Sequence, residues 1–199
     1  EFKAMEVAIE KLLRPVEDRK IPFSMIYGNH DDMNEITKKE QSDIYRSYPH
    51  FVGLDNDVEI LKDETFNIPI YSEDGSEIKF NLWMMDSAWK NKEEDKCYNQ
   101  VKPEAIEWYK KKSAELKAQN GGVPVPSLMF QHIPLIEMLD LMEECSKDDE
   151  GAFEGPDGKF FKAKPCVDGE IGEYICTVSQ GNGQVEAIKE CGDIKAIVF

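Results

Sequence analysis

Short apolar runs alternate with longer amphipathic stretches along this chain, and that alternation restricts the fold more than any other feature. Five of the runs have the length and composition of buried or half-buried strands. They lie at residues 21–28, 66–71, 78–86, 126–132 and 196–199. Strands separated by helical stretches are typical of α/β proteins. The second and third runs flank Asp74-Gly75, which predicts a hairpin and therefore a mixed sheet.

Four stretches carry the apolar period or the end signals of helices. They lie at residues 2–13, 101–122, 133–145 and 183–191. Pro15 is expected to stop the first helix, and Gly192 the last. The sequence predicts one domain over residues 1–199. Residues 146–183, rich in Gly, Asp and Lys, are predicted to be a loop insertion that carries one short strand.

Charge and composition narrow the function classes. The chain has 199 residues, 41% of them hydrophobic, and a net charge of −16, so a packed but strongly acidic domain is expected. An acidic surface repels phosphate backbones, so nucleic acid is not an expected partner. No run approaches the ~18 apolar residues of a membrane span. Five cysteines cannot all pair and none forms a C-x-x-C, so reduced thiols are expected. A Cys166–Cys176 disulfide stays open as an alternative in an oxidising compartment, and the compartment itself stays open.

The stretch Gly28-Asn29-His30-Asp31 directly follows an apolar run, and His132 directly follows another. Active-site groups collect at strand ends, where a rigid strand meets a variable loop. If the two strands are neighbours in one sheet, Asn29 and His132 converge. We expect Gly28 to let the backbone turn sharply, so that the polar side chains after it point inward.

An amide oxygen and an imidazole nitrogen together suit a divalent ion such as Zn, Mn or Fe. Asn29 and His132 are therefore the candidate metal ligands. Asp31 is placed to accept a hydrogen bond from His30 and orient its ring. Taken singly, each residue is also compatible with an ordinary turn or a capped loop end. The four-residue string after an apolar run is what favours a functional site.

These residues resemble a known family. "YGNHDD" is similar to the Gly-Asn-His-Asp/Glu motif of the calcineurin-like metallophosphoesterase superfamily, and "PSLMFQHIPL" is similar to the strand and histidine that follow in it. The segments "FQHIPL", "MDSAW" and "GDIKAIVF" resemble the sequences of the purple acid phosphatase-like branch. The resemblance extends from about Ile21 to Phe199. It implies an α/β/β/α fold, in which a mixed β-sheet sandwich is flanked by helices.

The resemblance also implies roles for the candidate residues. Asn29 and His132 resemble the amide and imidazole ligands of the second metal in a site of two divalent or trivalent ions (Mn, Zn or Fe). His30 resembles the histidine that contacts the phosphate and protonates or stabilises the leaving oxygen, and Asp31 its orienting partner. The implied reaction is hydrolysis of a phosphomonoester or phosphodiester by metal-activated water. The expected partner is therefore a phosphorylated small molecule or another phosphoester, with the oligomeric state open.

Members of that family also carry an Asp-x-His, a Gly-Asp-x-x-Asp and a Gly-His-x-His motif, and none of these occurs in this chain. We therefore expect the chain to be an internal segment, incomplete at both ends of the fold and inactive alone, of an active binuclear-metal phosphohydrolase. The alternative is a non-catalytic binding domain on a phosphoesterase-like scaffold. Two aromatic candidates are weaker: His50 is expected to pack at the surface unless its loop overhangs the site, and Trp89 to form a pocket wall.

Overall fold

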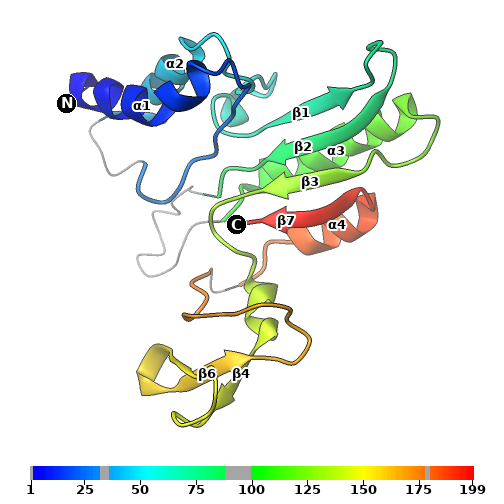
Figure 1. Cartoon of the computed structure of the whole chain (residues 1–199). Coiled ribbons are helices and arrows are strands. Elements are labelled where there is room, and N and C mark those ends of the chain that lie inside the picture. Colours follow the sequence, from blue (N-terminus) through cyan, green and yellow to red (C-terminus); the bar gives the residue numbers. More distant parts are fainter. Residues whose placement is uncertain (1, 32–35, 88–99, 178–179) are drawn as a thin grey trace.

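A computed structural model of the chain describes residues 2–31, 36–87, 100–177 and 180–199 (Figure 1). Its main sheet has four strands in the order β1-β2-β3-β7. Their bounds are Phe66–Tyr71 for β1, Ile78–Met84 for β2, Ser127–Phe130 for β3 and Ile194–Val198 for β7. β1 runs antiparallel to β2, whereas β2, β3 and β7 run parallel to one another. This sheet, with helices beside it, confirms the α/β class with a mixed sheet.

The β1–β2 hairpin forms where the sequence predicted it. Asp74 Oδ1 accepts hydrogen bonds from the hydroxyl groups of Ser72 and Ser76 at 2.6 and 2.8 Å and from the Ser76 backbone N–H at 3.1 Å. Gly75 follows with a φ of 71°, in the left-handed region that glycine adopts without strain. The turn chemistry therefore sets the register of the two strands.

Helices α3 (Pro103–Gln119) and α4 (Gln184–Cys191) contribute to the largest core cluster together with the sheet. Trp83 and Met129 meet Tyr109 of α3 and Ala187 of α4, and all four residues are almost fully buried. Alternate residues of β2 point to the other face, where Met84 packs with Leu54 and Phe66. The sheet is thus covered by helices α3 and α4 on one face and, near the end of β2, by the cluster around Met84 on the other, whereas Ile70 of β1 and Val198 of β7 are exposed.

Helices α1 (Phe2–Glu17) and α2 (Lys38–Arg46) pack through Ile9, Leu13 and Ile44. The expectation that Pro15 ends the first helix is wrong, because α1 continues to Glu17. A proline removes one N–H donor but leaves its neighbours free to bond. The N–H of Asp18 donates to the carbonyl of Arg14 at 2.9 Å and closes the turn across the proline.

Two further expectations about elements are wrong. Residues 21–28 were expected to form a strand, but they are extended and make one isolated bridge, Phe23 to Phe51. The hydrogen bonds of this bridge are confined to Phe23, which pairs with His50 and Val52, so no ladder forms. The helix expected over residues 133–145 is a short 3-10 helix, η2 (Ile136–Leu141), followed by strand β4 (Met142–Cys145). β4 pairs with a strand further along the chain, and that pairing outweighs the helical pattern.

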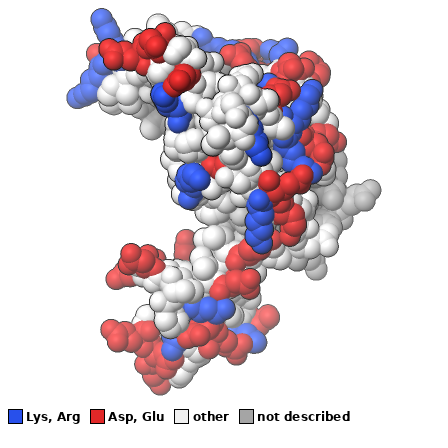
Figure 2. All heavy atoms as spheres, turned by 90° about the vertical axis from the view of Figure 1, so that its right-hand side faces the viewer, with Lys and Arg blue, Asp and Glu red and all other residues white. Residues whose placement is uncertain are grey.

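A second, three-stranded sheet has the order β4-β6-β5, with β5 at Phe153–Glu154 and β6 at Phe160–Ala163. Residues 146–183 therefore contribute two strands rather than the one expected. Figure 2 shows acidic side chains gathered over this part of the molecule, with few basic ones among them. Lys159 and Lys162 pair with Glu144 and Asp149 at 2.8 and 2.9 Å. Whether this region is an insertion stays a prediction.

The remaining expectations concern thiols and membranes. Cys145, Cys166, Cys176 and Cys191 are all free, so the alternative disulfide between Cys166 and Cys176 is not formed. Cys97 and Trp89 lie outside the described residues. Among the helices that the structure describes, none combines the length and apolarity needed to cross a membrane.

Candidate metal site at the end of the sheet

The structure brings Asn29 and His132 together although they are far apart in the sequence. Asn29 Oδ1 lies 2.9 Å from His132 Nε2. Asn29 is in the loop that follows the extended residues 21–28, and His132 lies two residues beyond the carboxyl end of β3. An amide oxygen only accepts hydrogen bonds, so Nε2 carries the proton in this contact. His132 is exposed and Asn29 is half-buried.

Gly28 has a different purpose from the sharp turn that the sequence suggested. Its φ lies outside the left-handed region. A Cβ atom at this position would instead lie 3.1 Å from Cδ2 and 3.2 Å from Nε2 of His132. The imidazole ring thus lies against the bare backbone of Gly28. Glycine is needed here for close approach, not for a special backbone angle.

The loop that carries Asn29 and His30 is closed by Asp31. Asp31 Oδ2 accepts the N–H of Gly28 at 2.6 Å, and the Asp31 N–H donates to the Gly28 carbonyl at 3.2 Å. His30 is exposed between Asn29 and Asp31. The expected role of Asp31 in orienting His30 stays a prediction. What the structure shows is that the Asp31 carboxylate holds the loop itself.

Helix α2 supports the same loop from outside. The buried Gln41 donates through Nε2 to the carbonyl of Asp31 at 2.7 Å. The helix begins at a capping box, in which Thr37 and Glu40 bond reciprocally through side chain and backbone. The hydrogen bonds from the backbone and hydroxyl of Thr37 hold the pKa of Glu40 below its usual range. Glu40 is therefore charged when the cap is formed, and the cap stabilises the start of α2, the helix that holds the loop through Gln41.

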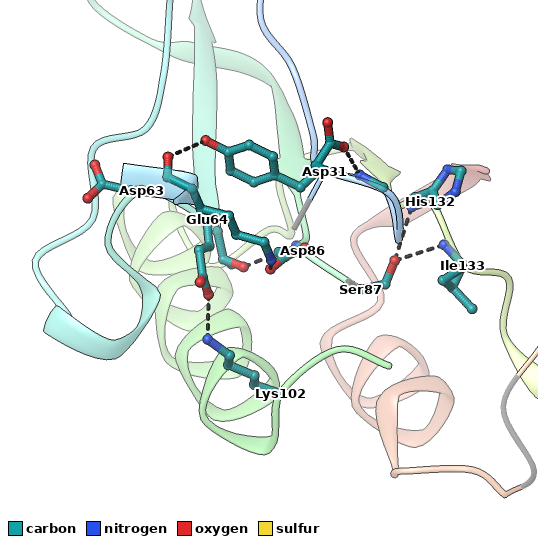
Figure 3. Close-up of polar contacts among 12 residues, drawn as sticks. Asp31, Asp63, Glu64, Asp86, Ser87, Lys102, His132 and Ile133 are labelled. Atoms are coloured by element: carbon teal, nitrogen blue, oxygen red, sulfur yellow. Dashed lines mark hydrogen bonds and ion pairs between the residues drawn. The ribbon is translucent and has the colours of Figure 1, made fainter. Parts of the chain in front are cut away.

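An ion pair connects α2 to the end of β2. Lys38 Nζ lies 2.5 Å from Asp86 Oδ2, with side chains only 13% and 2% exposed (Figure 3). Tyr27, which is fully buried, donates its hydroxyl to the carbonyl of Lys38 at 2.9 Å. Burial raises the pKa of the Tyr27 phenol, so that it remains a donor. The loop with Asn29 and the strand end near His132 are therefore tied to one scaffold.

Ser87, which follows Asp86, holds the backbone at His132. Its hydroxyl oxygen accepts the backbone N–H of His132 at 3.1 Å and that of Ile133 at 2.8 Å (Figure 3). Sequence reasoning did not single out Gln41, Lys38, Asp86 or Ser87 as parts of the site. The available signal was the position of Asp86-Ser87 just after an apolar strand, as for His132.

The distance between Asn29 Oδ1 and His132 Nε2, 2.9 Å, is that of an ordinary N–H···O hydrogen bond. Two ligand atoms at about 2.1 Å from one tetrahedral ion are about 3.4 Å apart, so the two side chains would separate by about half an ångström to hold a cation between them. Among residues 2–31, 36–87, 100–177 and 180–199, no group of three or more His, Cys, Asp or Glu side chains is arranged to hold a metal. That Asn29 and His132 are metal ligands stays a prediction.

His50 lies in a separate contact. Its Nδ1 is 2.7 Å from Glu17 Oε2, and its backbone N–H donates to Glu17 Oε1 at 3.1 Å. The Glu17 carboxylate thus ties the loop around residue 50 to the end of α1. This agrees with the expectation that His50 packs at the surface.

Comparison with curated proteins finds distant relatives. An uncharacterized protein of Schizosaccharomyces pombe is 25% identical over 151 residues, covering 75% of this chain and 26% of the relative. Phosphatase DCR2 of Saccharomyces cerevisiae is 29% identical over 160 residues, covering 68% of this chain and 24% of that protein. The probable inactive purple acid phosphatase 28 of Arabidopsis thaliana is 24% identical over 219 residues, covering 96% of this chain and 52% of that protein.

The chain therefore spans between about a quarter and about half of the length of these relatives. No protein-family profile matches the chain, and no solved structure matches it. Two of the three relatives carry phosphatase names, which is a distant similarity to a phosphoesterase family.

Proposed function

We propose that this chain is part of a metal-dependent phosphoesterase of the calcineurin-like, purple acid phosphatase-like kind, which hydrolyses a phosphomonoester or a phosphodiester. The single observation that carries the proposal is the 2.9 Å contact between Asn29 Oδ1 and His132 Nε2. A neutral amide oxygen and an imidazole nitrogen that lie side by side are a donor set that suits Zn, Mn or Fe. The phosphatase names of distant relatives support the same reaction class.

In this proposal Asn29 and His132 hold one ion of a binuclear site. When bound, the ions neutralise charge on the phosphate and lower the pKa of a water molecule that attacks phosphorus. Binding requires the lone pair of His132 Nε2, so the proton now on Nε2 moves to Nδ1 or to solvent. The Asn29 amide oxygen needs no such change. Its ligand strength therefore does not depend on pH.

His30 lies next to Asn29 in the sequence and is exposed, and in this proposal it contacts a substrate phosphate held at the metal site. Its role is to donate a proton to the leaving oxygen, or to stabilise the charge that forms there. Asp31 stabilises the loop through its bond to the Gly28 N–H and is proposed to orient the ring of His30.

The test uses the complete gene product, with an aryl phosphate and the corresponding diester as substrates and Mn, Zn and Fe supplied separately. We expect His30→Ala to lower turnover about 100-fold or more while leaving the metal content unchanged. Asn29→Ala and His132→Ala are expected to lower the metal content itself. His50→Gln is the matched control, because this third histidine bonds Glu17, and it should change neither quantity. Absence of hydrolysis with every metal would refute the proposal.

A second candidate function is a binding domain that has lost catalysis. One observation favours it: the relative that covers most of this chain is named a probable inactive phosphatase. Metal analysis of the complete gene product separates the two functions. A catalytic protein retains metal that depends on Asn29 and His132, whereas a binding domain is folded and metal-free.

A further inference from the structure

Ser87 occupies an unusual position for a buried hydroxyl group. Its side-chain oxygen accepts two successive backbone N–H groups, those of His132 and Ile133, at 3.1 and 2.8 Å. Ser87 is 0% exposed, and Ile133 is 5% exposed. Buried N–H groups need an acceptor, and an unpaired one costs as much as a lost hydrogen bond.

The two contacts extend the sheet beyond its last backbone pair. The Met85 N–H donates to the Phe130 carbonyl at 2.9 Å on the β2 side of β3. The Gln131 N–H donates to the Val198 carbonyl at 3.0 Å on the β7 side. Because strand backbone groups alternate between sides, the next N–H on the β2 side is that of His132. There the hydroxyl of Ser87 takes the place of a strand carbonyl.

Gln131 holds the backbone just after His132 as well. Its Nε2 donates to the Ile133 carbonyl at 2.8 Å, and its Oε1 accepts from Gln184 of α4 at 2.5 Å. Ser87 therefore holds the N–H groups of His132 and Ile133, and Gln131 holds the carbonyl of Ile133. The imidazole ring itself is exposed, so its direction depends on this fixed backbone and on Gly28 beneath it.

We infer that Ser87 is a positioning residue, whose hydroxyl holds the backbone of His132 so that Nε2 meets Asn29 Oδ1. The part of this inference that concerns a shared cation rests on the proposed function. The part that concerns the Asn29–His132 contact does not, because that contact exists without metal. Ser87 acts through His132 and touches neither the cation nor the substrate.

The test compares Ser87→Ala with two other variants. Ser87→Thr keeps the hydroxyl and should restore the contacts. Ser127→Ala is the matched control, because Ser127 is also a fully buried serine, lies at the opposite end of β3 and donates to the Val125 carbonyl at 2.8 Å. It removes a buried hydroxyl from β3, the strand that leads to His132, without touching His132. Thermal unfolding of all variants measures the general loss of stability.

The first readout is NMR of the complete gene product prepared without metal. In Ser87→Ala, the backbone N–H groups of His132 and Ile133 should exchange with solvent about tenfold faster. The ring ¹⁵N shifts of His132 should also lose the signature of a hydrogen bond to Asn29. Ser127→Ala should leave both signals unchanged even where it lowers the unfolding temperature equally. If the two variants give the same exchange rates and ring shifts at His132, Ser87 has no positioning role.

The second readout is the affinity of the complete gene product for Mn or Zn alone. We expect Ser87→Ala to weaken it about tenfold, as is usual when a partner of a metal ligand is removed, and Ser87→Thr to restore it. If the wild type binds metal and Ser87→Ala binds it with the same affinity, the part of the inference that concerns metal is wrong, and the part that concerns the Asn29–His132 contact is unaffected. A wild-type protein that binds neither ion overturns the proposed function, whereas the NMR comparison still decides the role of Ser87.

Discussion

The size of residue 28 matters more at this site than its backbone angle. His132 lies against the bare Cα of Gly28, and no left-handed φ is involved. A methyl group there would meet the ring at 3.1 Å, so the ring must shift by a few tenths of an ångström. The ring is exposed and free to shift, so the strain falls on the Asn29–His132 contact and not on the core.

Gly28→Ala should therefore separate stability from binding. Alanine at an unstrained glycine position removes freedom from the unfolded chain, so the free energy of unfolding should stay equal or rise by about 0.5 kcal/mol. The His132 contact should weaken, with a loss of metal affinity of about tenfold. Urea unfolding and metal titration measure the two quantities.

Gly172→Ala is the matched control, because a Cβ atom there meets nothing within 4 Å and the backbone is not left-handed. It should leave metal affinity unchanged. Equal metal affinity in Gly28→Ala and in the wild type would contradict the proposed close approach.

Sequence reasoning identified the pair Asn29 and His132 but not the residues that hold them. Polar residues after two apolar runs are visible in the sequence. The expected route to their convergence, two neighbouring strands, is wrong, because residues 21–28 make only one isolated bridge and lie outside the main sheet. Ser87 and Gln41 act through side-chain hydrogen bonds to backbone atoms, those of Ser87 lying 45 and 46 residues away in the chain and that of Gln41 at Asp31 ten residues away. Serine and glutamine are common in loops and on helices, so no local pattern distinguishes them.

At the scale of elements, the structure agrees with the sequence where local chemistry and long-range pairing coincide. The hairpin at 66–84, the helix α3 and the strands β3 and β7 were all expected. Residues 21–28 and 142–145 were misassigned for opposite reasons. The first has strand composition but only one bridge, and the second has a helix-like pattern but pairs with β6. The secondary structure of both segments depends on pairing with residues distant in the chain, and the apolar period of a segment carries no information about such pairing.

The hairpin turn supplies a pH prediction. The hydrogen bond from the Ser72 hydroxyl, and then those from the Ser76 backbone and hydroxyl, lower the pKa of Asp74 to about 2. A carboxyl group whose pKa is lowered by folding stabilises the folded state above its ordinary pKa of 3.8. That stabilisation is lost as the pH falls from about 4 to about 2.

A ¹³C carboxyl titration by NMR measures this pKa directly. Asp74→Asn keeps a side-chain oxygen as acceptor but cannot titrate, so its unfolding should depend less on pH over the same interval. An Asp74 that titrates at its ordinary value would show that the three hydrogen bonds do not persist in solution.

At the scale of the whole molecule, a buried carboxylate joins the layers at the end of the sheet away from the candidate site. Asp193, 2% exposed, precedes β7. Tyr109 of α3 donates its hydroxyl to Oδ1 at 2.5 Å, and Trp83 of β2 donates its Nε1–H to Oδ2 at 3.1 Å. Burial and the nearby Asp193 carboxylate raise the pKa of Tyr109, so its hydroxyl stays a donor.

Asp193→Ala should destabilise the whole fold. It leaves the buried hydroxyl of Tyr109 and the indole N–H of Trp83 without their acceptor, and we expect a loss of about 3 kcal/mol in the free energy of unfolding. Tyr109→Phe removes one donor and leaves the acceptor partly satisfied, so about 1 kcal/mol is expected. Urea unfolding followed by tryptophan fluorescence gives both values. A smaller loss for Asp193→Ala than for Tyr109→Phe would contradict this description of the core.

The most direct measurement counts metal ions in four forms of the complete gene product: wild type, Asn29→Ala, His132→Ala and the double variant. If both side chains bind one ion, each single variant loses the same one equivalent, and the double variant loses no more than either. Losses that add up in the double variant would place the two residues at different ions. A metal content that is unchanged in all three variants would show that neither residue is a ligand.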